Sequence, residues 1–185
     1  MKVFFTRHGE TEWNRRDIIL GREDIPLNET GRVQAAALAQ RIEDEKIPID
    51  VIICSPLSRA LETAGYCARK LDIDVITDQR LIEWDFGEYE GKDRHTPGYQ
   101  QAKGEFAVRL PGGESVFDVV TRVYALLDEL PRKYPGKNVL LVCHGGVCRI
   151  VECYARGLTH YEFMHFFMGN CELRSYDPQD ISVKR

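Results

Sequence analysis

The stretch Val139-Leu-Leu-Val-Cys-His-Gly-Gly146 decides the fold, because an unbroken apolar run ends there in a histidine and two glycines. Such a run suits a strand that is covered on both faces, as in a parallel sheet. Val3-Phe-Phe-Thr-Arg-His-Gly9 has the same pattern near the start of the chain. A third run, Asp50-Val-Ile-Ile-Cys54, is followed by Ser55-Pro-Leu-Ser-Arg59. We therefore expect three buried strands that each lead into polar residues.

Four amphipathic helices are predicted between and after these runs. Asn28 is expected to cap the first, and Ser55 and Pro56 to be the cap and first residue of the second, which ends near Leu71. Ser115-Val-Phe-Asp118 has the form of a capping box and opens the third. The periodic apolar positions are Ala35, Leu38, Ala39 and Ile42 in the first helix, Val116, Val119, Val120, Val123, Leu127 and Leu130 in the third, and Val147, Ile150, Val151 and Tyr154 in the fourth.

Strands that alternate with helices predict an α/β fold with a mostly parallel sheet. Two further short strands are expected, at residues 74–77 and, on an edge, at residues 172–176. From about residue 80 to 113 the pattern breaks down into a long excursion with one short helix near Tyr99 to Phe106, and such excursions often act as active-site lids. The sequence has no internal repeat or linker, so residues 1–185 are expected to form a single domain.

The composition excludes several classes of protein. With 43% hydrophobic and 29% charged residues, the chain is expected to be soluble and globular. A net charge of −4 argues against nucleic-acid binding, which usually requires a basic patch. The six cysteines contain no C-x-x-C pair, so we expect reduced, structural cysteines and no metal site. The sequence shows no signal peptide and no membrane-spanning run, which favours a cytoplasmic protein without a membrane partner.

Four basic side chains are expected to meet at one edge of the sheet. Arg7 and His8 follow the first strand, Arg59 the second and His144 the third. Ligands bind outside the carboxyl ends of parallel strands, and guanidinium groups pair well with phosphate oxygens. A neutral imidazole can attack phosphorus and form a phosphohistidine, which splits one displacement into two. These residues therefore predict a site for a phosphoryl group.

Phosphoryl transfer from an ester also needs an acid that protonates the leaving alkoxide. The excursion offers four carboxyl groups, and the pattern alone does not choose among them. They are Glu83, Asp85, Glu88 and Glu90.

Five motifs resemble those of the histidine phosphatase superfamily, which includes cofactor-dependent phosphoglycerate mutases and α-ribazole phosphatases. The motifs are Arg7-His-Gly-Glu-Thr-Glu-Trp-Asn14, Ser55-Pro-x-x-Arg59-Ala-x-x-Thr-Ala64, Leu81-x-Glu83-x-x-x-Gly87-x-x-x-Gly91, Pro111-Gly-Gly-Glu-Ser115 and His144-Gly-Gly146. They occur in the family's order and cover nearly the whole chain. The resemblance implies a three-layer α/β/α fold like that of phosphoglycerate mutase.

The resemblance also implies a role for each matching residue. His8 would be the phosphorylated nucleophile, and Glu83 the general acid that later activates water. Asn14 would be an additional phosphate ligand, and Gly21 would allow close backbone approach. The phosphate pocket would comprise Arg7, Asn14, Gly21, Arg59 and His144. The resemblance implies no metal ion and no cofactor.

The chain departs from the mutases in ways that favour a phosphatase. Leu20 stands where the family usually has a polar residue, and Phe86 where the mutases have tyrosine. The mutases carry a longer insertion with paired arginines that bind the substrate carboxylate, whereas residues 91–111 here contain no adjacent basic pair. We therefore expect a phosphomonoesterase that releases inorganic phosphate from a small metabolite. A mutase and a catalytically inactive phosphate-binding regulatory module are the alternatives, and the sequence does not reveal the oligomeric state.

The remaining basic and aromatic residues receive simpler expectations. Lys92 and Arg109 are expected to be surface charges, whereas Arg94 could equally lie over an anion as a lid residue. Five residues near the C-terminus are expected to be core and not a recognition surface, namely Tyr161, Phe163, Phe166, Phe167 and Met168.

Overall fold

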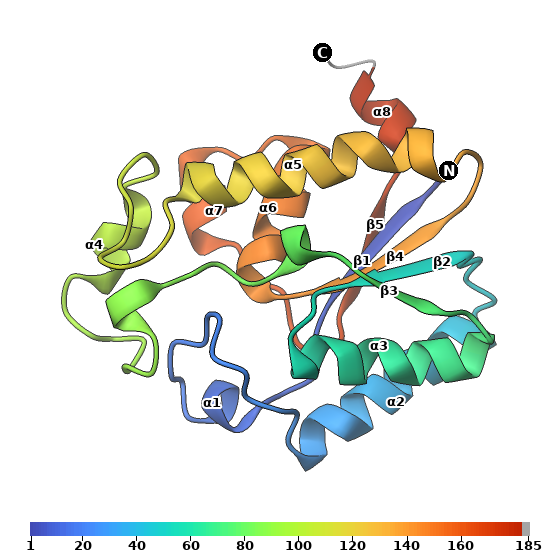
Figure 1. Cartoon of the computed structure of the whole chain (residues 1–185), viewed down its shortest axis with the longest axis horizontal. Coiled ribbons are helices and arrows are strands. Elements are labelled where there is room, and N and C mark those ends of the chain that lie inside the picture. The colour runs from blue at the N-terminus through green and yellow to red at the C-terminus, as the bar shows by residue number, and fades with distance from the viewer. Residues whose placement is uncertain (183–185) are drawn as a thin grey trace.

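A five-stranded sheet forms the centre of the protein in the computed structural model, which describes residues 1–182 (Figure 1). Its strand order is β3-β2-β4-β1-β5. The strands are β1 (Val3–Arg7), β2 (Val51–Cys54), β3 (Val75–Thr77), β4 (Val139–Cys143) and β5 (Leu173–Tyr176). The first four pair in parallel, and β5 pairs antiparallel with β1 at an edge. The predicted mostly parallel sheet is thus confirmed.

Helices cover both faces of this sheet. Helices α2 (Glu29–Asp44) and α3 (Ser58–Leu71) lie on one face, and α5 (Val116–Lys133) and α6 (Gly145–Arg156) lie on the other (Figure 1). Because side chains alternate along a strand, Phe4 packs in the α2–α3 core while Phe5 packs in the α5–α6 core. Both faces being apolar explains why β1, β2 and β4 are continuous apolar runs.

Two of the three predicted helix starts are confirmed. The Asn28 side chain accepts a hydrogen bond from the Gly31 N–H, and Ser115 forms a capping box with Asp118. The predicted start of the second helix is wrong, because α3 follows Leu57 and has no side-chain cap. The Ser55 hydroxyl lies 2.7 Å from Nε2 of His144, a partner 89 residues away that no local pattern could indicate.

The excursion between residues 80 and 113 packs onto the ends of the sheet and of α5, on the left of Figure 1. It contains two 3-10 turns, η1 (Gln79–Leu81) and η2 (Gly87–Tyr89), and the short helix α4 (Tyr99–Gly104). Trp84, Phe86, Tyr99 and Leu110 are buried in the same core as α5. This segment therefore packs tightly against the rest of the protein. The one short helix that was expected in it is α4.

Three short helices were not predicted from the sequence, because each is too brief for an apolar period. They are α1 (Glu12–Arg15), α7 (His160–His165) and α8 (Pro178–Ser182). All six cysteines are free. None of the helices within residues 1–182 combines the length and the apolar character needed to cross a membrane.

Candidate active site

A cavity of about 340 Å³ lies where β1 and β4 end and the excursion covers them. Four of the seven predicted site residues line it, and three do not. Its walls are formed by Arg7, His8, Glu10, Asn14, Asp17, Leu20, Glu83, Phe86, Arg94, Tyr99, Lys103, Gly145, Gly146, Arg149, Phe166, Phe167, Met168 and Asn170. Arg59 and His144 lie directly behind His8, and Gly21 lies beyond them.

The His8 ring is held so that one nitrogen keeps a free lone pair. Its Nδ1 lies 2.6 Å from the Gly9 carbonyl oxygen, which can only accept, so Nδ1 carries the proton and Nε2 does not. Burial, and then the charges of Arg59 and Arg7, hold the pKa of His8 well below its ordinary value. The ring is therefore neutral at physiological pH, which is the form that can act as a nucleophile.

His144 lies against His8, with ring centroids 5.1 Å apart, but both its nitrogens have protein partners. Arg59 donates from Nε to Nδ1 at 3.3 Å, so the proton sits on Nε2 and is donated to the Ser55 hydroxyl at 2.7 Å. Burial and the Arg59 charge lower the pKa of His144 well below its ordinary value. His144 is thus a neutral ring that orients the guanidinium of Arg59.

Arg59 is fully buried at the start of α3. Its Nη1 donates to the Glu23 carbonyl at 2.8 Å, and its Nη2 donates to the Gly21 carbonyl at 2.6 Å. Burial lowers the pKa of Arg59 to about 10, which still leaves it charged at neutral pH. Arg59 therefore contributes a fixed positive charge from behind His8.

Gly21 serves a different purpose from the one expected. A Cβ atom at this position would collide with the carboxylate of Glu90 and the carbonyl of Trp84. That carboxylate accepts hydrogen bonds from the backbone N–H groups of Arg22 and Glu23 at 2.9 and 3.0 Å. The absent side chain thus makes room for a protein carboxylate, and Gly21 does not reach the cavity.

Arg7 enters the cavity with an unsatisfied donor. Its Nη1 donates to the Met168 carbonyl at 3.2 Å, whereas its buried Nε has no partner within residues 1–182. Burial lowers the pKa of Arg7, and the nearby Glu83 carboxylate partly opposes this. The positive charge of Arg7 on the cavity wall favours an anionic ligand beside His8.

Glu83 is placed by the start of α6. Its Oε2 accepts from the Gly146 N–H at 3.0 Å, and its Oε1 accepts from its neighbour Trp84 N–H at 2.8 Å. A Cβ on Gly146 would lie 2.5 Å from Oε1, so only glycine permits this approach. Among the four carboxyl groups considered above, Glu83 alone lines this cavity.

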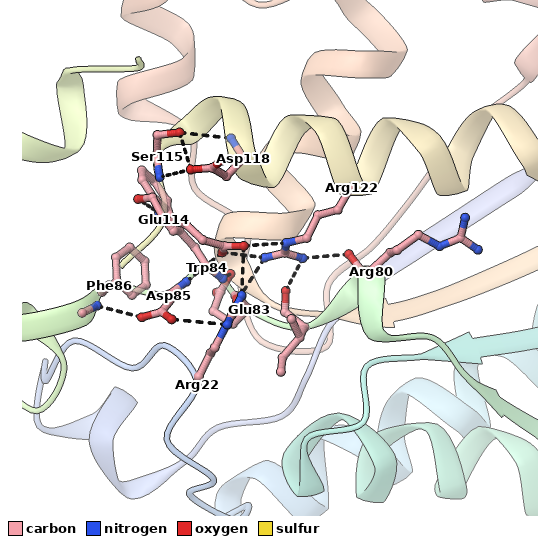
Figure 2. A network of polar contacts seen from close by, with 12 residues as sticks. Arg22, Arg80, Glu83, Trp84, Asp85, Phe86, Glu114, Ser115, Asp118 and Arg122 are labelled. Atoms are coloured by element: carbon pink, nitrogen blue, oxygen red, sulfur yellow. Dashed lines mark hydrogen bonds and ion pairs between the residues drawn. The ribbon is translucent and has the colours of Figure 1, made fainter. Parts of the chain in front are cut away.

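Arg122 of α5 fixes the backbone that carries Glu83 (Figure 2). Its guanidinium donates to the carbonyls of Arg80 and Ile82 at 2.7 Å each, and to that of Glu83 at 3.1 Å. The same group binds both carboxylate oxygens of Glu114 at 3.1 Å. The sequence patterns gave no role to Arg122, although it lies three residues after the buried Val119 on one helix face.

Two asparagines complete the wall near His8. Asn14 accepts from the Thr11 N–H through Oδ1 at 3.2 Å, closing the capping box of α1. Its side-chain NH₂ donors are left for the cavity, which it lines. Asn170, which was not anticipated, donates from Nδ2 to the His8 carbonyl at 2.8 Å and thereby holds the backbone of that residue.

The outer basic residues divide into two kinds. Lys92 is exposed, and Arg109 pairs with Asp118 at the surface, as expected. Arg94 and Lys103 line the cavity, together with Arg149, which received no role from the sequence. Lys103 follows the buried Tyr99 by four residues on α4, a spacing that places both on one face.

The expectation that the C-terminal aromatic residues are core is partly wrong. Phe163 and Met168 are buried, but Tyr161 is 70% exposed and Phe167 is 73% exposed. Helix α7 is only six residues long, so it has room for one buried aromatic side chain. Phe167 instead lines the cavity. Among residues 1–182, no group of three or more histidine, cysteine or acidic side chains could hold a metal ion.

Comparisons with known proteins agree with this geometry. The model of the histidine phosphatase superfamily (branch 1) matches residues 3–183. A Yersinia pestis protein named "Probable phosphoglycerate mutase GpmB" is 34% identical, over 97% of this chain and 86% of its own length.

Two solved structures are also similar to the chain. A mycobacterial glucosyl-3-phosphoglycerate phosphatase, complexed with VO3, is 31% identical with a TM-score of 0.83, and the match covers 94% of this chain and 91% of that one. A phosphoserine phosphatase of Entamoeba histolytica, complexed with 3-phosphoglyceric acid, is 28% identical with a TM-score of 0.84, and the match covers 97% of this chain and 91% of that one.

Proposed function

Since this chain belongs to the histidine phosphatase superfamily, we propose that it is a metal-independent phosphomonoesterase that acts on small phosphorylated metabolites through a phosphohistidine. One observation carries the proposal. The neutral His8 ring, whose Nε2 is unprotonated, lines a cavity whose wall also includes the Arg7 guanidinium group and the carboxyl group of Glu83. Phosphoryl transfer from an ester requires a nucleophile, a cation that binds the phosphoryl oxygens, and an acid at one site.

In the first step, Nε2 of His8 attacks the phosphorus atom of the bound ester. The N–P bond forms as the P–O bond to the leaving group breaks, and Glu83 gives its proton to the departing alkoxide. Arg7 and Asn14 contact the phosphoryl oxygens, while Arg59 adds positive charge from behind the ring. The Gly9 carbonyl accepts a hydrogen bond from Nδ1–H throughout, so it stabilises the charge that develops on the imidazole.

In the second step, Glu83 is a carboxylate and acts as the base. It takes a proton from a water molecule, whose oxygen attacks phosphorus as the N–P bond breaks. Inorganic phosphate leaves, and His8 and Glu83 return to their starting protonation states. No metal ion is used, because the two guanidinium groups neutralise the transferring oxygens.

The roles of the remaining predicted residues are indirect in this proposal. His144 orients Arg59, and the Gly21 carbonyl accepts a hydrogen bond from it. Location in the cytoplasm and the single-domain organisation of residues 1–185 remain predictions from the sequence. α-Ribazole phosphate, sugar phosphates, phosphoglycerates and nucleotide-related esters remain the substrate candidates.

A mutase is the second candidate, because the similar Yersinia pestis protein is named a probable phosphoglycerate mutase. A mutase returns the phosphoryl group of the phosphohistidine to a second hydroxyl and needs a bisphosphate primer. Isomerisation of 3-phosphoglycerate to 2-phosphoglycerate with such a primer separates it from a phosphatase. An inactive regulatory module is disfavoured, because a neutral histidine and a carboxyl group line the same cavity.

The decisive experiment measures p-nitrophenyl phosphate hydrolysis in EDTA by the whole chain and by His8→Ala. We expect the wild type to be active and the variant to lose at least about 10³-fold in kcat. His165→Ala, which changes an exposed histidine on α7, is the matched control and should remain active. Protein quenched in SDS at alkaline pH, where the N–P bond survives, should carry phosphate on His8. Hydrolysis that survives in His8→Ala, or inactivity across a broad panel of phosphate esters, would contradict the proposal.

A further inference from the structure

The Gly9 carbonyl is the group that supports positive charge on the His8 ring. Burial, Arg59 and Arg7 lower the pKa of His8, whereas the hydrogen bond between Nδ1 and the Gly9 carbonyl, 2.6 Å long, raises it. The first step of the proposed reaction gives the ring positive charge as Nε2 bonds to phosphorus. Any group that makes the Gly9 carbonyl a stronger or weaker acceptor therefore acts on the reacting ring.

The peptide group that contains this carbonyl also has a partner on its opposite side. The Gly9 carbonyl and the Glu10 N–H belong to one peptide group, and that N–H donates to Oε1 of Gln34 at 2.8 Å. A backbone N–H can only donate, so it must face the oxygen of the Gln34 amide and not its nitrogen. A chain of hydrogen bonds thus runs from Gln34 through one peptide group to Nδ1 of His8.

Such a chain makes each of its members stronger. A peptide group is planar and its electrons are delocalised, so an acceptor on the N–H raises the partial negative charge on the carbonyl oxygen. Each bond in a chain of this kind is strengthened by about 10–30%. Gln34 does not line the active-site cavity, yet its amide oxygen makes the Gly9 carbonyl a better acceptor for the His8 ring.

Other contacts already hold this backbone in place. The Gly9 N–H donates to the Thr63 hydroxyl at 3.0 Å, and the Glu10 carbonyl accepts from the Asn28 N–H at 3.0 Å. These two bonds fix the peptide groups on either side of the one that Gln34 contacts. The bond to Gln34 is therefore chiefly an electronic contribution and only secondarily an anchor.

We propose that Gln34 is a positioning residue that acts on His8 through the Gly9–Glu10 peptide and stabilises the phosphohistidine relative to the free ring. The inference rests on the proposed function, because the charge that Gln34 supports develops when Nε2 of His8 bonds to phosphorus. A ring that is a better nucleophile is also a poorer leaving group. Gln34 should therefore speed the formation of phosphohistidine and slow its hydrolysis.

Two substitutions change the chain in opposite directions. Gln34→Met removes the acceptor and nearly keeps the length of the side chain. Gln34→Glu keeps an acceptor and gives it a negative charge, and hydrogen bonds to charged groups are about twice as strong as neutral ones. The matched control is Gln40→Met, because Gln40 is an exposed glutamine of the same helix, α2, whose amide donates only to the side chains of Glu43 and Asp44.

The two chemical steps are measured separately with p-nitrophenyl phosphate. Single-turnover stopped flow follows nitrophenol release, and rapid quenching into SDS at alkaline pH follows the decay of phosphohistidine. We expect Gln34→Met to slow formation by about 3- to 10-fold, the effect of one hydrogen bond, and to make the phosphohistidine decay faster. Gln34→Glu should move both rates the other way, and Gln40→Met should change neither.

A purely structural role would give a different result. A disturbed active site slows formation and hydrolysis together, whereas a change in the stability of the phosphohistidine moves the two rates in opposite directions. Opposite changes in Gln34→Met thus support the proposal. Slowing of both steps, or wild-type rates in both Gln34 variants, would overturn it.

A measurement on the resting protein separates this inference from the proposed function. The Nδ1–H proton of His8, assigned by its absence in His8→Ala, is observed by NMR at pH 7 without any ester. Its resonance should move upfield in Gln34→Met and downfield in Gln34→Glu, and stay unchanged in Gln40→Met. These shifts support the link even if no ester is hydrolysed. Hydrolysis of p-nitrophenyl phosphate with an unshifted proton in both Gln34 variants leaves the phosphatase standing and refutes the link.

Discussion

The two ends of the cavity are built differently. At the strand ends, His8, Arg59 and His144 are held by backbone carbonyls and by one another. At the other end, Lys103 of the excursion and Arg149 of α6 lie over aromatic rings, and the buried Arg149 Nε has no acceptor among residues 1–182. The first end is preorganised by the protein itself, as a reacting centre must be. The second holds cations that rest mainly on aromatic rings, so their burial is compensated less fully by the protein.

The largest effect is expected for Glu83→Gln, which tests the end of the cavity next to the strand ends. An amide cannot give or take the proton, so kcat should fall by about 10²- to 10⁴-fold. With p-nitrophenyl phosphate, whose leaving group needs little protonation, phosphohistidine should accumulate and be visible after quenching in SDS at alkaline pH. Glu88→Gln changes an exposed carboxyl group of the same excursion and serves as the control. Equal losses in both variants would break the assignment of the acid.

Arg122→Met is expected to have the next largest effect, because it removes the group that binds three carbonyls next to Glu83. We expect kcat to fall by about 10- to 100-fold through misplacement of the acid. The free energy of unfolding should fall by about 2 kcal/mol. Stopped-flow turnover and urea unfolding measure the two effects.

A positioning role for Arg122 has its own signature. Arg122→Lys should recover part of the kcat that Arg122→Met loses. Arg122→Met should also shift the pH profile of kcat, because this profile depends on the acid Glu83. Loss of stability with an unchanged pH profile and unchanged kcat in the folded fraction would limit Arg122 to a structural role.

The sharpest test of the excursion end is the stability of Lys103→Met. The pKa of Lys103 is lowered to about 8 in the folded protein from an ordinary 10.5, so the folded state binds fewer protons than the unfolded state between these values. The free energy of unfolding therefore rises with pH across this window, and the buried charge is destabilising below pH 8. We expect Lys103→Met to stabilise the ligand-free protein at pH 7 by on the order of 2 kcal/mol.

Thermal unfolding at pH 7 and pH 10 measures this effect. The gain should shrink as pH rises toward 10, because the wild-type lysine is by then neutral in the folded state. Lys92→Met should show no such dependence. A destabilised Lys103→Met at pH 7 would indicate that the ammonium is compensated by the protein, which would remove the contrast between the two ends.

The smallest effect is expected at Arg109, which lies in the excursion but faces solvent. Its side chain is 72% exposed and pairs with Asp118 at 2.9 Å. Exposed pairs of this kind contribute about 1 kcal/mol or less, so Arg109→Gln should change stability only slightly. Its kcat/KM for p-nitrophenyl phosphate should equal the wild-type value. A clear loss of kcat/KM would show that the surface residue Arg109 contributes to substrate binding.

The sequence predicted the parts of the fold that local physics determines. The apolar runs at β1, β2 and β4 and the caps at Asn28 and Ser115 depend on neighbours within a few residues. The start of α3 was mispredicted, because Ser55 binds the distant His144 and does not cap its own helix. Local propensity is overridden wherever a long-range partner claims the same atom.

The candidate site shows the same limit. Residues next to strand ends, such as His8 and His144, could be placed together from topology alone. Lys103 and Arg149 meet only because the excursion folds back over α6, and no spacing in the sequence relates them. Gly21 was assigned to the ligand, whereas its missing side chain accommodates Glu90. Close approach could be expected at this glycine, but its partner depends on the tertiary structure.

The Arg7 guanidinium on the cavity wall has a consequence for the product of the proposed phosphatase reaction. The donors that hold an ester fit orthophosphate equally well, since both present the same tetrahedral oxygens. The released ion is thus a competitor for the next ester, and it stabilises the folded chain by mass action. For the proposed phosphatase we therefore expect turnover to slow in a phosphate-rich medium, because released phosphate competes with the fresh ester.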